Sequence, residues 1–203
     1  MAKELKLRLP SNWDEDGMLA NKKFSYMVYL AILRGSKKSK DEDYRYKYDV
    51  TVSNLKRSTG LDYCTCKRKL QYLIEQGFII MEEDNLAKIP KIEGSSFVLL
   101  TETEIETLLS LGSKSEYSIR IFIYLKRLEY PSLMQGTKIK PSQECIARRV
   151  GLSPTNKMKI QKCVDELRDC GLIVTKKYWL QEQDVSPKLI MEYMIPGVRK
   201  KSK

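Results

Sequence analysis

The sequence contains no histidine. Histidine is the commonest general base and a frequent metal ligand, so its absence excludes Ser-His and Cys-His nucleophile pairs. Cys64 and Cys66 are separated by a single residue, which is not the spacing of a zinc site, and no second cysteine pair lies near them in the sequence. No phosphate-binding glycine loop is present either. These absences predict a protein that is not an enzyme and that binds no metal and no cofactor.

Long apolar runs are also missing. The longest candidates, near 27–33 and 119–125, are too short to cross a membrane. The five cysteines are odd in number and unevenly spaced, which indicates reduced thiols rather than a disulfide framework. The first six residues alternate charge and leucine and lack the apolar run of an export signal. We therefore expect a cytoplasmic protein that makes no membrane contact.

Positive charge is in surplus. Lys and Arg number 37 against 26 Asp and Glu, which gives a net charge of +11. Such a surplus points toward a polyanion such as DNA or RNA, because each phosphate neutralised by Lys or Arg releases condensed counterions. Solubility alone is the alternative interpretation, and composition leaves both open.

An internal repeat organises the chain. Residues 55–61 read Leu-Lys-Arg-Ser-Thr-Gly-Leu, and residues 146–152 read Ile-Ala-Arg-Arg-Val-Gly-Leu. Each run is followed by a helical stretch that ends in Gly, an apolar residue and Ile, at 77–79 in the first copy and at 171–173 in the second. The second copy carries three extra residues after its Gly-Leu pair. Apart from that insertion, both copies follow one template.

The match extends upstream. Residues 24–33 and 119–128 each place apolar side chains on one helical face, and each helix is preceded by a short β-like segment, at 5–9 or at 97–100. Four elements in the same order indicate a duplication. The predicted boundaries are 1–95 for the first domain, 96–198 for the second and 199–203 for a flexible basic tail.

Each copy predicts the order helix, short extended segment, helix, tight turn, helix and two strands. Gly60 and Gly151 suit the left-handed conformation that ends the first helix of each pair, and Gly77 and Gly171 end the second helix in the same way. Ser142 after Pro141 is typical of a helix N-cap. The expected helices lie near 21–35, 51–59, 63–76, 101–111, 116–129, 142–150 and 155–170, and the expected strands near 46–50, 78–82, 86–92, 137–140, 172–180 and 188–195.

Two stretches of the second copy resemble a known family. Residues 140–153, Lys-Pro-Ser-Gln-Glu-Cys-Ile-Ala-Arg-Arg-Val-Gly-Leu-Ser, and residues 159–173, Lys-Ile-Gln-Lys-Cys-Val-Asp-Glu-Leu-Arg-Asp-Cys-Gly-Leu-Ile, resemble bacterial winged helix-turn-helix proteins. Residues 51–80 look like a more diverged member. The resemblance covers nearly all of the chain and implies an α+β, mainly helical fold with two tandem winged-helix domains. By analogy it also implies a replication-initiator-like or regulatory role in a plasmid, phage or conjugative element.

The resemblance implies a DNA-reading face on the second helix of each pair. Aligning these helices on their terminal glycines places Cys66 opposite Ile160. The predicted buried stripes are Cys66, Leu70, Leu73 and Ile74 in the first copy and Ile160, Cys163, Val164 and Leu167 in the second. The N-terminal half of such a helix meets base edges in the major groove, where Arg and Lys suit guanine and Asn and Gln suit adenine. The residues expected to contact DNA bases are Tyr63, Thr65, Lys67, Arg68, Gln71, Asn156, Lys157, Lys159, Gln161 and Lys162. A solvated helix face is the alternative interpretation.

Other basic residues are expected to bind DNA phosphates. Such contacts fix the position of the protein along the duplex but do not select a base sequence. They are Lys56, Arg57, Arg148, Arg149, Lys176 and Lys177. The two hairpin tips, at 82–85 and 181–184, carry acidic residues that phosphate repels, so we expect the wings to stay out of the minor groove and to pack against the other domain or a partner protein. The basic tail at 199–203 is expected either to add salt-sensitive affinity or to be a solvated chain end.

Two functions from different classes follow. The first is a site-specific binder of double-stranded DNA in replication, transfer or transcription control, which acts as a pseudo-dimeric monomer or a weak homodimer. Because the two recognition helices differ in sequence, this function predicts a non-palindromic target. The second is a protein-interaction scaffold for replication, transfer or transcription proteins, with weak or no specific DNA binding. The first copy is the stronger candidate for that role, because residues 1–95 hold 18 basic and 14 acidic residues, against 19 and 12 in 96–203.

Overall fold

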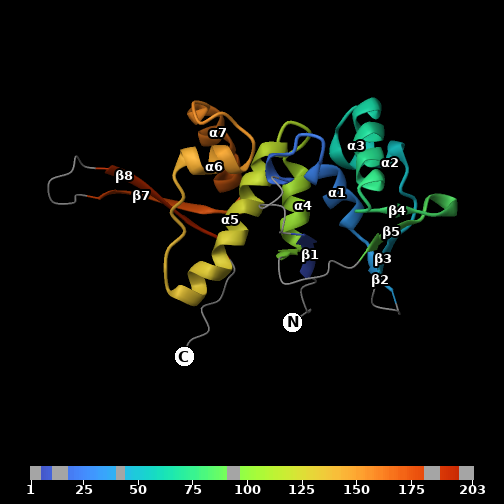
Figure 1. Cartoon of the computed structure of the whole chain (residues 1–203), viewed down its shortest axis with the longest axis horizontal. Helices are drawn as coiled ribbons and strands as arrows, with labels where there is room; N and C mark the ends of the chain where they lie inside the picture. Colours follow the sequence, from blue (N-terminus) through green and yellow to red (C-terminus); the bar gives the residue numbers. More distant parts are fainter. Residues whose placement is uncertain (1–5, 11–17, 40–43, 91–96, 181–187, 197–203) are drawn as a thin grey trace.

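The computed structural model describes residues 6–10, 18–39, 44–90, 97–180 and 188–196. It shows a mixed α+β fold with small antiparallel sheets, as the sequence predicts (Figure 1). In chain order, the elements are β1 (Lys6–Pro10), η2 (Met18–Ala20), α1 (Tyr26–Leu33), β2 (Lys37–Lys38), β3 (Tyr44–Lys47), α2 (Val52–Thr59), α3 (Tyr63–Glu75), β4 (Ile80–Met81), η3 (Glu83–Asn85), β5 (Ala87–Pro90), β6 (Phe97–Thr101), α4 (Glu102–Ser110), α5 (Glu116–Gln135), α6 (Gln143–Arg149), α7 (Lys157–Asp169), β7 (Val174–Leu180) and β8 (Lys188–Met194).

α1 lies at the centre of the molecule. Ser25 caps its N-terminus by accepting a hydrogen bond from the Val28 amide, and every residue from Tyr26 to Leu33 is buried. Helices α2 and α3 pack against it from the first half of the chain, and α4 and α5 pack against it from the second. The prediction of an apolar stripe on one face of 24–33 is therefore wrong for this helix, because neighbours from both halves cover it all round.

The first half closes with a four-stranded antiparallel sheet in the order β2-β3-β5-β4. Its strands are shorter than predicted, and β3 ends at Lys47 rather than at residue 50. The reason lies in Asp49, whose φ of 56° turns the chain out of the extended conformation, and in Thr51, which already caps α2. The half-buried rings of Tyr44 and Tyr46 lie on one side of the sheet, where both contact the Lys88 ammonium.

The second half differs from its predicted elements at two places. α5 continues to Gln135, past the expected end at 129, because Pro131 removes only one helical hydrogen bond and does not end the helix. The strand expected at 137–140 is reduced to a single bridge between Ile139 and Tyr193, beside the β7–β8 hairpin. No described helix is both long enough and apolar enough to span a membrane.

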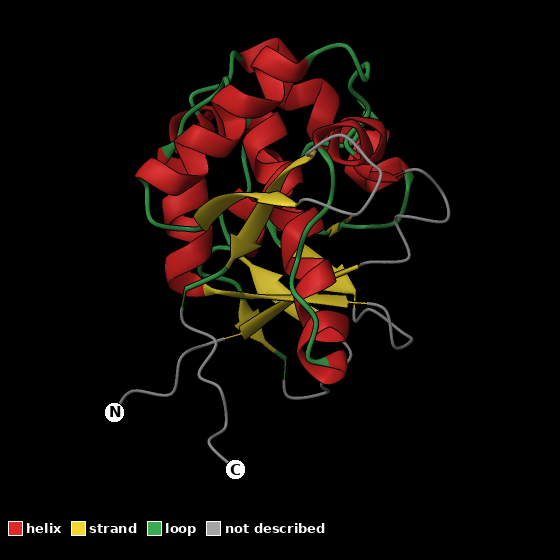
Figure 2. Ribbon diagram, turned by 90° about the vertical axis from the view of Figure 1, so that its left-hand side faces the viewer, coloured by secondary structure: helices red, strands yellow, loops and turns green. Residues whose placement is uncertain are grey.

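The two halves share an interface and one continuous apolar core. β1, near the start of the chain, pairs antiparallel with β6, with Leu7 opposite Leu100. Helices fill one side of the molecule and the strands lie mostly on the other, which Figures 1 and 2 show from two directions. The predicted domain boundary at 95/96 and the tail at 199–203 fall outside the described residues.

The predicted helix ends are confirmed. Gly60, Gly77, Gly151 and Gly171 all have φ between 68° and 77°, the left-handed conformation in which a side chain is strained. The Ser142 hydroxyl accepts a hydrogen bond from the Cys145 amide, as expected of an N-cap. Local sequence signals therefore set the start and the end of the helix pairs α2–α3 and α6–α7.

Candidate nucleic-acid interface

α3 presents a basic face at its N-terminal half. Asp62 caps the helix by accepting a hydrogen bond from the Thr65 amide, 2.8 Å away. Hydrogen bonds from the side chain and the main chain of Thr65 lower the pKa of the Asp62 carboxyl. The predicted stripe of Cys66, Leu70 and Leu73 is buried, while Ile74 is half-buried. Of the side chains predicted to read bases, Tyr63, Lys67, Arg68 and Gln71 are exposed and Thr65 is half-buried.

α7 presents the corresponding face in the second half. Ile160, Cys163, Val164 and Leu167 are buried, as the sequence predicts. Asn156, Lys157, Lys159 and Lys162 are exposed. Gln161 is half-buried and already hydrogen-bonded, since it accepts from Gln143 and donates to Asp165. The Lys159 ammonium lies 4.1 Å from the centre of the Tyr117 ring, which holds this side chain toward α5.

The helices that precede α3 and α7 end in exposed basic pairs. Lys56 and Arg57 lie in the last turn of α2, and Arg148 and Arg149 in the last turn of α6. Basic side chains at this position also stabilise a helix by interacting with its carbonyl end, so their placement has a structural cause as well. Arg148 in addition forms an ion pair with Glu144 at 2.5 Å.

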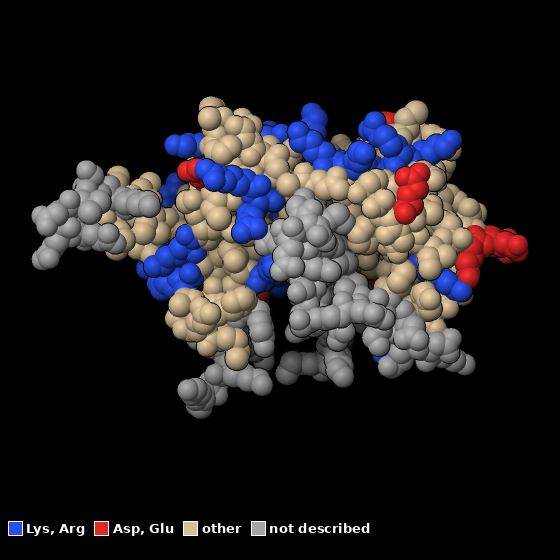
Figure 3. Space-filling view, in the orientation of Figure 1, with Lys and Arg blue, Asp and Glu red and all other residues tan. Residues whose placement is uncertain are grey.

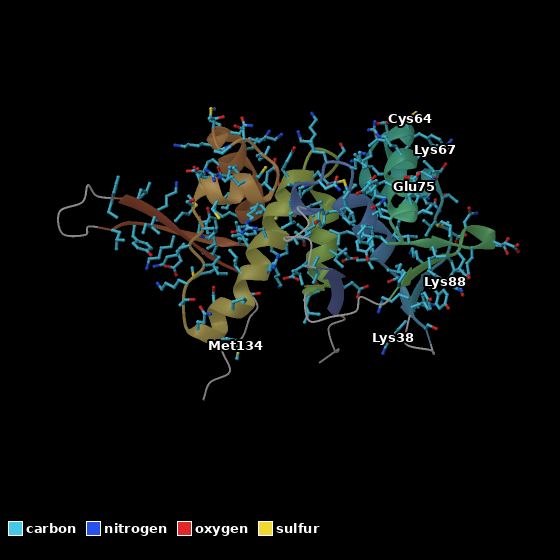
Figure 4. All side chains as sticks on the ribbon, viewed as in Figure 1. Lys38, Cys64, Lys67, Glu75, Lys88 and Met134 are labelled. Carbon is cyan, nitrogen blue, oxygen red and sulfur yellow. The ribbon has the colours of Figure 1, made fainter. Side chains whose placement is uncertain are left out.

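All four of these helices reach the same side of the molecule. In Figure 1, α2 and α3 stand at the upper right and α6 and α7 at the upper left, with α1, α4 and α5 between them. Lys and Arg atoms form a row along this upper edge, whereas Asp and Glu atoms are few there (Figure 3). Cys64 and Lys67 mark this edge at α3, and Lys38 marks the opposite one (Figure 4). The four helices that carry the helical residues predicted to contact DNA thus reach one edge of the molecule (Figure 1).

The hairpin residues are less suited to contact DNA together with these helices. Lys176 and Lys177 are both exposed, but they are neighbours on β7 and so point to opposite faces of the strand. One flat surface therefore cannot engage both of them. The first hairpin tip, Glu82–Asn85, is exposed, with Glu82 paired to Lys88. The second predicted tip, at 181–184, lies outside the described residues.

A polar joint connects the two halves behind this face. The Glu116 carboxylate, at the start of α5, accepts hydrogen bonds from the Ser25 hydroxyl and from the amides of Tyr26 and Met27, at 2.9–3.3 Å. These groups form the N-terminus of α1, where a negative charge is favoured by the exposed amides. A side chain of the second half therefore caps the central helix of the first.

Arg120 completes the joint one helical turn later. Its guanidinium is 2% exposed and donates to the carbonyls of Leu19, Asn21 and Phe24, as well as to Glu116. A buried charge needs such partners, because leaving it unpaired costs several kcal/mol. The segment from residue 19 to residue 24 is thus tied to α5 by two nitrogens of one planar guanidinium, Nη1 and Nη2, an arrangement that a lysine does not reproduce.

Each helix pair also touches a loop from the other half at its tight turn. A Cβ added at Gly151, between α6 and α7, would lie 2.6 Å from the Ala20 carbonyl oxygen. A Cβ added at Gly60, between α2 and α3, would lie 3.8 Å from the Ser113 Cβ. The loops 18–25 and 111–115 therefore lie between the two helix pairs and contact both of them.

Lys69 links α3 to the same region. Its ammonium donates to the main-chain carbonyls of Lys22 and Lys23. Partial burial lowers the pKa of Lys69, and the positive charges of Arg120 and Arg68 act in the same direction, while Glu116 opposes them. The Lys69 side chain therefore binds main-chain groups of the protein itself, although the neighbouring Arg68 is exposed.

Three of the five cysteines lie in surroundings that disfavour a reactive thiolate. Burial raises the pKa of the Cys66, Cys163 and Cys170 thiols, which favours their neutral form. Among the residues that the structure describes, no three His, Cys, Asp or Glu side chains are grouped so that they could hold a metal ion.

Sequence reasoning identified the exposed faces of α3 and α7 but missed the joint. Glu116 and Arg120 lie in a helix whose apolar pattern is visible in the sequence, yet their partners in the first half are 89 to 101 residues away in the chain. The signal available was Arg120 itself, a charged residue between Ile119 and Ile121 on an apolar helix. Comparison with protein-family models finds no match, and comparison with curated proteins finds none either.

Proposed function

We propose that this chain binds double-stranded DNA through two tandem winged-helix units, with α3 and α7 as the recognition helices. The observation that carries the proposal is that α3 and α7 both reach the upper edge of the molecule (Figure 1), where Lys and Arg atoms gather (Figure 3), and that the basic residues in their N-terminal halves are exposed. A duplex is a long, regular polyanion, so two readers on one edge can engage it together. The order of elements in each half, a helix pair followed by a hairpin, supports the same assignment.

The residue types at the two reading faces fit different base patterns. Arg68 and Lys67 offer donors of the kind that guanine accepts, while Asn156 and Gln71 can pair with adenine. The exposed pairs at the ends of α2 and α6 would hold phosphates and set the register. Since the two helices are not copies of each other at these positions, the proposed target is non-palindromic and is bound by one chain acting as a pseudo-dimer.

The proposed biological setting is a plasmid, phage or conjugative element, where such a protein would start replication, act in transfer or regulate transcription. This setting follows from the resemblance of residues 140–173 and 51–80 to bacterial winged helix-turn-helix proteins. We propose a cytoplasmic DNA-binding protein rather than an enzyme, because neither reading helix presents a nucleophile with a partnered base.

Selection from a pool of random duplexes tests this function directly. We expect the recovered sequences to share an asymmetric motif, bound with one chain per site and with affinity that falls steeply as salt rises, because several phosphates are neutralised. Recovery of a strict palindrome bound by two chains would disprove the pseudo-dimer. Little affinity for any duplex at low salt would disprove DNA binding itself.

A second candidate function is a protein-interaction scaffold, and two features favour it. The hairpin tip Glu82–Asn85 is acidic and exposed, so it would be repelled by phosphate. Trp179 and Leu189 face each other across β7 and β8 and remain 68% and 50% exposed, and paired apolar residues of this kind are common in protein interfaces. If the scaffold is the main function, replacing both residues with Ser should leave DNA affinity unchanged and abolish binding of a replication, transfer or transcription protein.

A further inference from the structure

The centre of the upper edge is basic as well as its two ends. Lys22 and Lys23, in the loop before α1, and Lys114, in the loop between α4 and α5, are all exposed. The row of Lys and Arg atoms in Figure 3 continues across the middle of the molecule, between the α2–α3 pair and the α6–α7 pair. None of these three lysines belongs to either reading helix or to the helix that precedes it.

The loops that carry these lysines are held firmly between the two helix pairs. Lys69 of α3 binds the carbonyls of Lys22 and Lys23, and Arg120 of α5 binds the carbonyls on the N-terminal side of the same loop. In the other loop, Lys114 is followed by the buried Ser115, whose hydroxyl donates to the Leu111 carbonyl and lies 3.5 Å from the Glu166 carboxylate of α7. These contacts hold the main chain of both loops, while Lys22, Lys23 and Lys114 are themselves exposed.

We propose that Lys22, Lys23 and Lys114 form a third DNA-contact site, which binds phosphates of the duplex in the stretch between the two recognition helices. The inference rests on the proposed function, since it requires α3 and α7 to lie on one duplex. A duplex that spans both helices passes over the loops between them. Its phosphates there would lie next to the three lysines, and the opposite charges would attract each other. Phosphate contacts of this kind position the protein without reading sequence.

The fixed joint makes this site sensitive to the length of the duplex. Because Arg120 and Glu116 tie the first half to α5, the lysine bridge and both reading helices move as one body. The proposed site is therefore occupied only when the duplex is long enough to span both recognition helices. A duplex that ends directly after one half-site leaves the bridge without phosphates.

The experiment compares two double variants with the same change of charge. Lys22→Ala/Lys23→Ala removes two ammonium groups from the bridge, and alanine keeps the main-chain carbonyls that Lys69 binds. Lys37→Ala/Lys38→Ala removes two exposed ammonium groups from β2, at the edge opposite α3 (Figure 4). Affinity for the selected duplex is measured for both variants across a salt series, with thermal unfolding as the check on folding, and Lys114→Ala is measured as a single change.

We expect Lys22→Ala/Lys23→Ala to weaken binding to the full site on the order of tenfold and to lower the salt slope by about 2, since each lost phosphate contact removes about 0.9. Lys114→Ala should lower the slope by about 1. The β2 variant should keep the slope of the wild type, and all variants should bind equally to a short duplex that ends directly after one half-site. Equal slopes for the bridge and β2 variants would overturn the third site while leaving the proposed function standing. Absence of salt-dependent binding by the wild type would overturn both.

Discussion

The two halves of the chain present α3 and α7, the proposed reading helices, on different supports. In the first half the helix pair packs on α1, which is buried on every side, and the Asp62 side chain caps the start of α3. In the second half the pair rests on the long α5, and α7 starts at Asn156, whose side chain makes no capping hydrogen bond. The turn between the helices is open at Gly60 and tightly packed at Gly151. Two similar exposed helices can therefore be supported by different caps, turns and neighbouring helices, because both pack on one continuous core.

The largest expected effect tests whether the two halves share stability. Leu73→Ala and Leu167→Ala each empty a fully buried position of a reading helix and should each lower the free energy of unfolding by about 2–5 kcal/mol. Because the core is continuous, urea unfolding should show a single transition in both variants. Two separated transitions would mean that the halves unfold independently.

The second prediction concerns the two turn glycines. Both have positive φ, so alanine is strained at either, but only at Gly151 does the new Cβ meet main chain, the Ala20 carbonyl. We expect Gly60→Ala to lower the free energy of unfolding by roughly 1–2 kcal/mol. Gly151→Ala should cost about 1–3 kcal/mol more, because of overpacking. Thermal and urea unfolding of the two variants measure the difference, and equal losses would contradict the contact between Gly151 and Ala20.

The third prediction compares the two reading faces. Lys67→Ala/Arg68→Ala and Lys159→Ala/Lys162→Ala should each weaken binding to the selected duplex by roughly tenfold or more, without changing the thermal midpoint appreciably. Each variant should relax base preference only in its own half of the motif. Binding titrations and repeated selection with each variant measure both effects. Normal affinity in both variants would show that the reading faces are assigned wrongly.

The smallest expected effect concerns the helix starts. Asp62→Ala removes the cap of α3, whereas Asn156→Ala removes a side chain that makes no capping bond, so only the first should lower the thermal midpoint. The folded-state pKa of Asp62 is depressed below its ordinary value of 3.8. The cap is therefore fully stabilising above that value and is lost as pH falls through the lower, folded-state pKa. Thermal midpoints measured from pH 7 down to pH 2 should show the gap between wild type and Asp62→Ala closing only at the acidic end.

The elements that sequence predicted well are those set by local signals. Gly60, Gly151 and Ser142 mark helix ends through their own backbone preferences, and the buried stripe of α7 follows from its helical period. The elements that it missed depend on distant residues. Nothing local to 24–33 says that α4 and α5 will cover the outer face of α1, and the strand at 137–140 fails because only Ile139 meets a partner.

The candidate site also has one part that the sequence predicts and one part that depends on distant contacts. The exposed basic half of α3 could be located from sequence, since exposure follows from the period of the helix. The central lysines could not, because Lys22 and Lys114 are 92 positions apart and sit in loops whose relative placement only the folded joint determines. A long-range ion pair or carbonyl cluster has no periodic signature in a single sequence.

The cap that Glu116 places on α1 has a consequence for the nascent chain. Tyr26 and Glu116 are separated by 90 positions, so a ribosome that adds about 5–20 residues per second makes α1 roughly 5–20 s before the carboxylate that accepts from its first amides. During that interval the most apolar helix of the protein also lacks the cover of α4 and α5. We therefore expect holding chaperones to bind the emerging first half, and a premature stop codon before residue 116 would release a chain whose central helix keeps its Ser25 cap but lacks the Glu116 carboxylate and the cover of α5.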